Sequence, residues 1–398
     1  MAVFTDEFMR IEGADGKVFI IYADINRLEQ HMKELAPEDK DVIAEFIEAL
    51  HSSTHFDMSD IEFMGKWVNI SIQDFAQRFQ NPFLREAFPL TFDLPDMPML
   101  AVLFILALMH LKIAGYPLGG SLEFSRAIER RYLGLGGEIH YKSPVTRILV
   151  ENDQAVGVRL ADGTEYRSDI VISAADGRTT IFDMLDGKYI NDDIHGYYEK
   201  LPLFSPLIYI ALGVARSFDE LPHSVSGISY SLDEPVTIAG KERKRLDVQI
   251  YNFDPSLAPA GKTVVRIMLD SDYEYWKKLK QDPERYKAEK EQIADKVIAL
   301  LDRRFPGLAA QVEMRDVATP MTWERNTGNW RGSFEGWLVT TKTIGMQMSK
   351  TLPGLENFYM AGQWVEPVGG LPPAAMSGRN AIQIICEEDK KPFVTSIP

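Results

Sequence analysis

A glycine-rich stretch near the C-terminus has the residue types of a ligand-binding loop. It reads NFYMAGQWVEPVGGLPPAAMSGRNAIQII, a short apolar run followed by glycines and then a helical pattern. Gly362, Gly369 and Gly370 allow a ligand to approach the backbone closely, because glycine has no side chain. Pro372 and Pro373 suit the first turn of a helix, whose free amides and positive dipole end stabilise negative charge. A purely structural strand-to-helix connection would use the same residues.

Tryptophans recur at regular spacing in a second glycine-rich segment, TPMTWERNTGNWRGSFEGW. Trp323, Trp330 and Trp337 are seven residues apart. Large aromatic side chains at this spacing could line an apolar channel, or they could fill the seam between two domains. The spacing favours neither alternative.

Few titratable side chains are grouped in a way that predicts catalysis. Glu324, Arg325 and Glu335 could carry protons or form ion pairs. His51 and His55 have the spacing of a zinc pair, but no glutamate follows His51 and Ser-Ser-Thr separates the two. We interpret them as surface histidines, expect no metal site, and identify no catalytic side chain.

Composition excludes several classes of protein. The 398 residues carry 43 basic and 58 acidic side chains, a formal charge of −15 that disfavours nucleic acid as a partner. The single cysteine, Cys386, excludes an internal disulfide and fits a cytoplasmic protein. The longest apolar run, Met99–Met109, is much shorter than the roughly 20 residues of a membrane-spanning helix.

The spacing of apolar residues predicts a mixed α/β protein. Short strands are expected at GEIHY, VTRILV, AVGVRL and TEYRS. The continuous apolar run Asp169–Ala174 is typical of a strand buried in a parallel sheet. Leu207–Val214, Val248–Tyr251 and Thr263–Leu269 predict a second, mostly antiparallel sheet. Because the strand Phe358–Ala361 needs a parallel sheet to join, we expect two interleaved domains.

The N-terminal part predicts a hairpin followed by helices. Phe8–Glu12 and Lys17–Tyr22 flank a turn signal, Gly-Ala-Asp-Gly. Apolar spacing indicates helices at Asn26–Leu35 and Glu38–His51, and Ser71–Asp74 resembles a capping box.

Two further segments carry predictions about surfaces. The apolar run could be a helix buried in the core, the wall of an apolar ligand tunnel, or a helix that dips into a membrane. We predict that the helix from Met97 to Ala114 borders a long hydrophobic cavity with the second sheet, and that Leu103 and Leu106 contribute to binding there. The basic run KERKR at 241–245 is interpreted as a solvated loop, with contact to an anionic membrane as the alternative.

Three blocks together resemble the phytoene desaturase-like FAD-dependent oxidoreductases, which include carotenoid desaturases, carotenoid isomerases and retinol saturases. The blocks are YPLGGSLEFSRAIERRYLGLGGEIHYKSPVTRILVENDQAVGVRLADGTEYRSDIVISAAD, then the tryptophan segment, then the C-terminal stretch. Their order and spacing match the family. The resemblance implies an incomplete FAD/NAD(P)-binding Rossmann-like domain, interleaved with a substrate domain of antiparallel sheet plus helices. The expected boundaries are 1–115 and 186–345 for the substrate domain, and 116–185 and 346–398 for the FAD-binding domain.

The resemblance also implies a set of cofactor-binding residues: Val145, Ala174, Ala175, Gly362, Gln363, Gly369, Gly370, Leu371, Pro372 and Ala374. Val145 would place its backbone against the adenine, and the two alanines after the buried strand would flank the ADP moiety. Gly362 and Gln363 would approach the pyrophosphate and ribityl chain. The residues that open the last helix would meet the isoalloxazine. Many relatives have an acid where this chain has Gln363, whose amide also hydrogen-bonds a hydroxyl.

The sequence departs from the family at its start. Relatives open with a strand, a GxGxxG turn and a helix that hold the FAD pyrophosphate. No such element occurs here, because GLGG at 134–137 and GG at 119–120 follow no apolar strand. We therefore expect the 398-residue chain to bind FAD weakly or not at all.

Two functions remain open on these observations. The resemblance implies an FAD-dependent oxidoreductase of desaturase, saturase or isomerase type, acting on carbon-carbon bonds of an apolar polyene or lipid. The alternative is a non-catalytic remnant that binds a lipid or partner without turnover. Amine oxidation is a third chemistry of the wider flavin superfamily, although WERNTG resembles the polyene branch more. We expect a cytoplasmic protein, either free or peripheral to the membrane.

Overall fold

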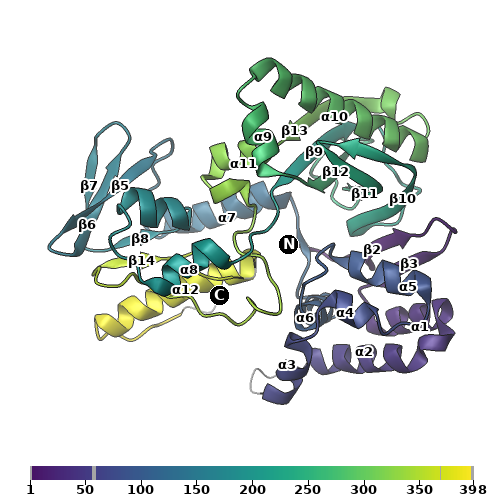
Figure 1. Cartoon of the computed structure of the whole chain (residues 1–398), viewed down its shortest axis with the longest axis horizontal. Coiled ribbons are helices and arrows are strands. Elements are labelled where there is room, and N and C mark those ends of the chain that lie inside the picture. Colours follow the sequence, from purple (N-terminus) through teal and green to yellow (C-terminus); the bar gives the residue numbers. More distant parts are fainter. Residues whose placement is uncertain (1, 56–59, 368, 396–398) are drawn as a thin grey trace. The chain divides into compact units, whose positions relative to one another are not determined.

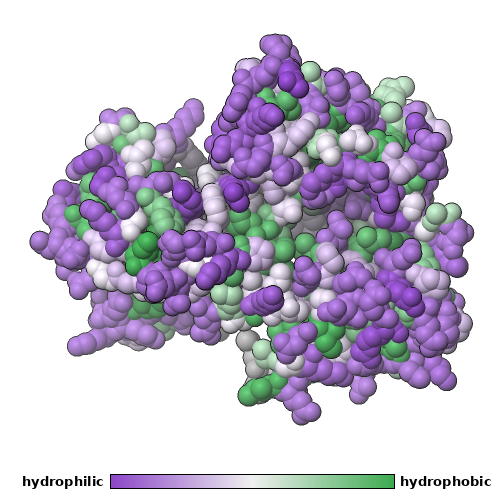
Figure 2. Space-filling view, in the orientation of Figure 1, coloured by the Kyte–Doolittle hydropathy of each residue, from purple (hydrophilic) through white to green (hydrophobic). Residues whose placement is uncertain are grey.

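Two compact units alternate along the chain (Figure 1). The computed structural model describes residues 2–55, 60–367 and 369–395. Unit 1 comprises Met1–Glu138 and Leu207–Thr319, and unit 2 comprises Ile139–Pro206 and Pro320–Pro398. Hydrophilic residues cover most of the face seen in Figure 2. None of the helices in the described ranges combines the length and apolar character needed to cross a membrane.

The unit boundaries lie at other residues than the sequence predicts, for identifiable reasons. Helix α7 (Gly120–Gly134) follows β4 (Tyr116–Pro117) and contacts it. The amide of Gly119 donates to Asp254 Oδ2 at 3.0 Å, which ties the start of α7 to unit 1. At the other boundary, Trp330 and Trp337 pack in unit 2, so the tryptophan segment belongs there.

Unit 1 contains a seven-stranded sheet in the order β13-β9-β12-β11-β10-β2-β3. All neighbours pair antiparallel except β10 and β2, which confirms the expected, mostly antiparallel sheet. Its strands are β2 (Glu7–Glu12), β3 (Val18–Tyr22), β9 (Leu207–Val214), β10 (Ser224–Ile238), β11 (Lys241–Ile250), β12 (Thr263–Asp270) and β13 (Val312–Ala318). The predicted N-terminal hairpin is β2 and β3.

The two faces of this sheet differ in character. One face buries alternate apolar residues such as Ile210 and Ile267, and α10 (Pro283–Arg304) packs along β13. The opposite face carries the side chains that alternate with them, among them Gln249 and Arg266, which lie opposite each other on β11 and β12. The apolar face anchors the sheet, and on the other face Gln249 and Arg266 line a cavity.

Helices complete unit 1. They are α1 (Ile25–Leu35), α2 (Lys40–Ser53), α3 (Ile61–Val68), α4 (Ile72–Ala76), α5 (Pro82–Ala87), α6 (Met99–His110), α9 (Tyr273–Leu279), α7 and α10. The predicted capping box at Ser71 and Asp74 is confirmed at the start of α4. Rings of Phe46, Phe75 and Phe88 form a buried aromatic cluster between these helices.

The prediction of a solvated loop at KERKR is wrong, because these residues form the first half of β11. Arg243 and Lys241 pair with Asp270, and Arg245 donates to Ser231 Oγ at 2.7 Å and to the carbonyl of Glu12 at 2.9 Å. These contacts hold Lys241, Arg243 and Arg245 on one face, while Glu242 and Lys244 alternate with them and are exposed, so the strand accommodates five consecutive polar residues.

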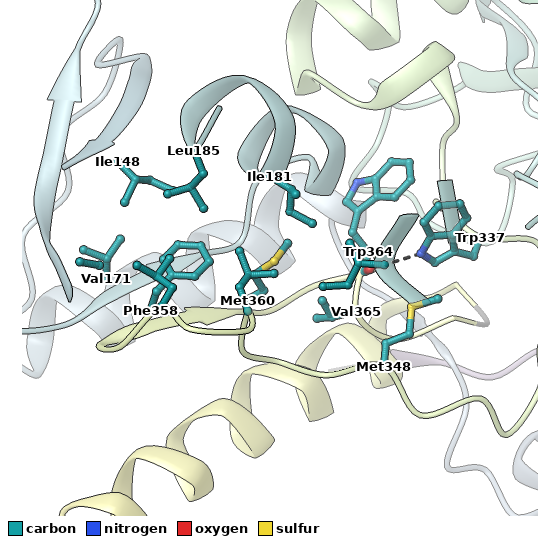
Figure 3. Close-up of a cluster of buried hydrophobic side chains, with 14 residues drawn as sticks. Ile148, Val171, Ile181, Leu185, Trp337, Met348, Phe358, Met360, Trp364 and Val365 are labelled. Carbon is teal, nitrogen blue, oxygen red and sulfur yellow. Dashed lines mark hydrogen bonds between the residues drawn. The ribbon is translucent and has the colours of Figure 1, made fainter. Parts of the chain in front are cut away.

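Unit 2 holds two small sheets. The strands β5 (Val145–Glu151), β6 (Gln154–Leu160) and β7 (Glu165–Arg167) form an antiparallel sheet, and β8 (Val171–Ser173) pairs parallel with β14 (Phe358–Met360). Helices α8 (Asp192–Lys200), α11 (Pro320–Thr327) and α12 (Leu371–Glu388) accompany them. Apolar side chains from both strands of the parallel pair, including Val171, Phe358 and Met360, share one core with Ile148 and Leu185 (Figure 3). The expected strand at GEIHY is absent from this described segment, because Gly137 closes α7 by donating to the carbonyl of Tyr132.

Replacing Asp39 with alanine should destabilise unit 1. The Asp39 carboxyl is 1% exposed and accepts the amides of Gln80 at 2.6 Å and Asn81 at 2.9 Å. Alanine leaves the amides of Gln80 and Asn81 without a hydrogen-bond acceptor, which should lower the free energy of unfolding by about 2 to 4 kcal/mol. Asp162→Ala is the matched control, since the exposed Asp162 also accepts an amide, that of Thr164 at 2.9 Å. Urea titration of both variants checks this, and equal losses would contradict it.

Candidate functional site

The first candidate site lies where β8 and β14 end side by side. Ser173 pairs with Met360, and the amide of Ala361 donates to the carbonyl of Ser173 at 2.9 Å. Ala174 and Gly362 follow directly, and a Cβ built on Gly362 would lie 3.8 Å from the carbonyl oxygen of Ala174. Gly362 has φ +94°, a conformation that side chains rarely adopt. Parallel strands bind ligands at such carboxyl ends, so the structure brings these predicted positions together.

A buried serine fixes the loop after β14. Ser377 on α12 is fully buried and accepts the amide of Gly362 at 2.6 Å, while its hydroxyl donates to the carbonyl of Ala374 at 2.6 Å. The amide of Gly362 is therefore already used. Gly362 offers a ligand close backbone approach rather than a hydrogen bond.

The start of α12 has fewer donors than the sequence suggests. Gly369 and Gly370 have φ of +70° and +89°, and the expected strand, loop and helix are confirmed. Pro372 and Pro373 carry no N–H, so the backbone of Leu371 and the helix dipole remain to stabilise an anion. Leu371 is exposed.

The loop residues Trp364 and Val365 border a cavity in unit 2. Its volume is about 340 Å³, and Met348, Met360 and Tyr198 also line it. The start of α12 is not among its lining residues. The loop before α12, and not the helix start, borders this cavity.

Val145 lies in the other sheet of unit 2, as the first residue of β5. The turn at the far end of β5 contacts the segment before β14, where the amide of Glu356 donates to the carbonyl of Asp153 at 2.9 Å. Val145 therefore lies in a different sheet from β8 and β14.

The tryptophan segment contributes to the core of unit 2. Trp330, Trp337 and Trp364 surround Tyr198, with ring centroids 5.1 to 6.5 Å apart. Trp337 Nε1 donates to the carbonyl of Trp364 at 3.2 Å, the dashed line in Figure 3. Trp330, Trp337 and Trp364 pack together inside one unit, which is neither of the two alternatives that the spacing left open.

A buried aspartate that the sequence analysis missed holds this cluster. Asp176 Oδ1 accepts the amide of Thr179 and Oδ2 accepts the amide of Trp330, both at 2.8 Å. Burial raises the pKa of the Asp176 carboxyl, and these hydrogen bonds oppose that rise. In the sequence, this aspartate could have been noticed as the Asp176-Gly177 pair that follows the apolar strand.

Glu335 lies against the second glycine pair of the loop. A Cβ built on Gly369 would be 2.5 Å from Glu335 Oε2, and the ring of Phe204 is on the same side. No basic side chain among the described residues pairs with Glu335, and burial raises its pKa to about 7. Of the three titratable residues named in this segment, Glu335 has the environment of a proton carrier.

The second candidate site is an apolar cavity formed within unit 1. Its volume is about 360 Å³, and Ile105 and Met109 of α6 line it together with Val225 of β10. The predicted cavity between the apolar helix and the second sheet is thus confirmed. Leu103 and Leu106 do not face it, because both are buried in the core on another side of α6.

Polar side chains at this cavity escaped the sequence analysis. Gln249 and Arg266 line it beside the apolar residues. An arginine at an alternate position of the apolar run TVVRIML was the available signal. The described residues include no group of three or more His, Cys, Asp or Glu side chains placed to hold a metal ion.

Comparison with known proteins identifies the family. The family described as flavin containing amine oxidoreductase matches residues 19–386, which is most of the chain. The chain belongs to this family.

Similar proteins have names that refer to carotenoids. The chain is 28% identical over 288 residues to a chloroplastic prolycopene isomerase of Arabidopsis thaliana, covering 71% of this chain and 47% of that protein. It is 29% identical over 273 residues to a zeta-carotene-forming phytoene desaturase of Myxococcus xanthus, covering 66% and 51%. The chain thus spans about half the length of the curated relatives it matches.

Solved structures show the same fold. An oxidoreductase from Methanosarcina mazei superposes with a TM-score of 0.60 at 18% identity, covering 96% of this chain and 82% of that one. Putrescine oxidase bound to putrescine gives 0.56 at 11% identity, covering 97% and 82%. At these identities the likeness concerns the fold alone, and it supports the predicted α/β class with a Rossmann-like part.

Ile105→Asn should mainly weaken binding, whereas Leu103→Asn should mainly destabilise the fold. Ile105 lines the cavity, so its replacement should weaken binding of the apolar dye Nile red about tenfold with little change in the melting temperature. Leu103 is fully buried in the core, so its replacement should cost about 3 kcal/mol or more of stability. Dye titration and thermal unfolding of both variants test this. A parallel loss of binding and stability in Ile105→Asn would show that the cavity is ordinary core.

Glu335→Gln should change how stability depends on pH. The folded pKa of Glu335 is about 7 and its ordinary value is 4.5. Between these values the folded state holds a proton that the unfolded state has released, so wild-type stability falls as pH rises through this window. Glutamine removes this effect. The variant should match the wild type near pH 4.5 and exceed it by about 3 kcal/mol at pH 8, measured by urea unfolding. A constant difference at both pH values would contradict the elevated pKa.

Proposed function

We propose that the protein is an FAD-dependent oxidoreductase acting on carbon-carbon bonds of an apolar polyene or other lipid. One observation carries the proposal: Ala174 and Gly362 lie together at the carboxyl ends of the parallel strands β8 and β14. Membership of a flavin-containing family and the names of the carotenoid-acting relatives support it.

The residues of unit 2 fit a flavin nucleotide as a set of backbone contacts. Ala174 and Ala175 have small side chains and Gly362 has none, and Gly362 and Gly370 have positive φ. Gln363 and the start of α12 supply an amide side chain and a helix dipole to the same loop. A bound flavin supplies hydride acceptance or donation, which the amino-acid side chains lack.

Unit 1 contributes the properties that an apolar substrate requires. Ile105, Met109 and Val225 form an apolar wall, and a substrate bound against it would have its own apolar surface removed from water. The charged side chain at this cavity is Arg266, a cation that disfavours a protonated amine as substrate. The cavity therefore favours polyene chemistry over amine oxidation within this family.

Gly362→Val should weaken whatever affinity the chain has for FAD, while Gly345→Val should not. Both glycines have positive φ, +94° and +85°, so valine strains the backbone equally, but only Gly362 lies at the strand ends. We expect at least about a tenfold weaker Kd for FAD in Gly362→Val, measured by flavin fluorescence, because close backbone approach is lost. Equal affinity in both variants would contradict the assigned flavin position.

A second function rests on the cavity alone. Every residue that lines it belongs to unit 1, so lipid binding needs nothing from the flavin loops. Anaerobic addition of a polyene to flavin-loaded protein separates the two functions. Bleaching of the flavin absorbance supports an oxidoreductase, whereas polyene binding by protein that takes up no flavin supports a lipid-binding protein.

A further inference from the structure

Two adjacent strands contribute polar side chains to the cavity of unit 1. Gln249 of β11 and Arg266 of β12 are direct cross-strand partners in the register of the sheet. Side chains of such partners lie on the same face, so both point away from the buried apolar face. Both line the cavity together with the apolar residues of α6 and with Tyr116.

The guanidinium of Arg266 has aromatic neighbours in place of a carboxylate. It lies 5.7 Å from the ring centroids of both Tyr209 and Tyr251. No acidic side chain within the described ranges forms a salt bridge with it, whereas Arg243, Arg304 and Arg315 of the same unit each pair with an acid. Ring contacts hold the cation in place and leave its hydrogen-bond donors for a ligand.

The side-chain oxygen of Gln249 is a second polar group at this cavity that lacks a hydrogen-bond partner among the described residues. The side chain of Gln249 is 5% exposed, and its Oε1 accepts no hydrogen bond from the described residues. A buried polar atom of this kind costs free energy unless it is paired. The amide can turn to present either its oxygen or its NH₂ group, so it can complement an acid or a hydroxyl beside Arg266.

We propose that this cavity binds a polyene or lipid that ends in a carboxylate, with the carboxylate held by Arg266 and Gln249. The inference rests on the proposed function, because it names the class of its substrate. A cation without an acidic partner in the wall of an apolar cavity complements an anion carried by an apolar chain. The net charge of −15 repels anions, so a local cation is needed to hold one. A hydrocarbon would leave both polar side chains without partners.

The test compares a polyene acid with its uncharged ester. cis-Parinaric acid and methyl parinarate share one chain and both fluoresce more strongly in an apolar site. Titration of the full chain without flavin keeps this test independent of the flavin proposal. We expect the acid to bind about tenfold or more tightly than the ester, because a charge-assisted bidentate hydrogen bond is lost on esterification.

Three variants test whether Arg266 causes the preference for the acid over the ester. Arg266→Met keeps the apolar stem and should lower the acid-to-ester ratio to about one, and Arg315→Met removes an exposed arginine of the same unit and should leave the ratio unchanged. Ile105→Trp should weaken both probes, which places them in this cavity. Equal binding of acid and ester by the wild type, or a preference that survives Arg266→Met, overturns the proposal. Either result leaves the flavin test unaffected.

Discussion

The parallel pairing of β8 with β14 is the contact on which the rest of unit 2 depends. It joins a strand near residue 172 to one near residue 359, and the whole of the second part of unit 1 lies between them in the chain. Because the two strands end together, the loops that follow them meet, and the Ser377 hydrogen bonds then fix where α12 begins. The tryptophan segment completes the core around the same pair through the amide of Trp330 and the indole of Trp337.

Unit 1 separates its two tasks between the faces of one sheet. The face that buries Ile210 and Ile267 supplies the apolar area that stabilises the fold. The other face carries polar and aromatic side chains beside α6, where they cost stability unless a ligand pairs with them. A sheet that is well packed on one side can tolerate such unsatisfied groups on the other, and functional sites are where they are expected.

Local sequence patterns predicted much of this arrangement and failed where long-range register decides. Apolar periodicity located the hairpin, β9, β12 and the return of the chain to a parallel sheet, because those patterns reflect burial directly. KERKR was misread because its charges are satisfied by residues distant in sequence, such as Asp270 and Glu12. The pairing of Gln249 with Arg266 and the contact of Glu335 with Gly369 also arise only when separate segments meet, and no spacing within one segment reveals them.

The interleaved order of the two units has a consequence for synthesis of the protein. A chain emerging from the ribosome can complete β8 early, but its parallel partner β14 and the indoles of Trp337 and Trp364 emerge only after all of unit 1. Val171 and Ile181 therefore lack these core partners, and stay exposed to water, while the intervening residues are synthesised. Closing so long a loop is slow, and apolar strands that remain unpaired during translation are prone to aggregate. Nascent unit 2 is thus the part of the molecule that most needs a chaperone.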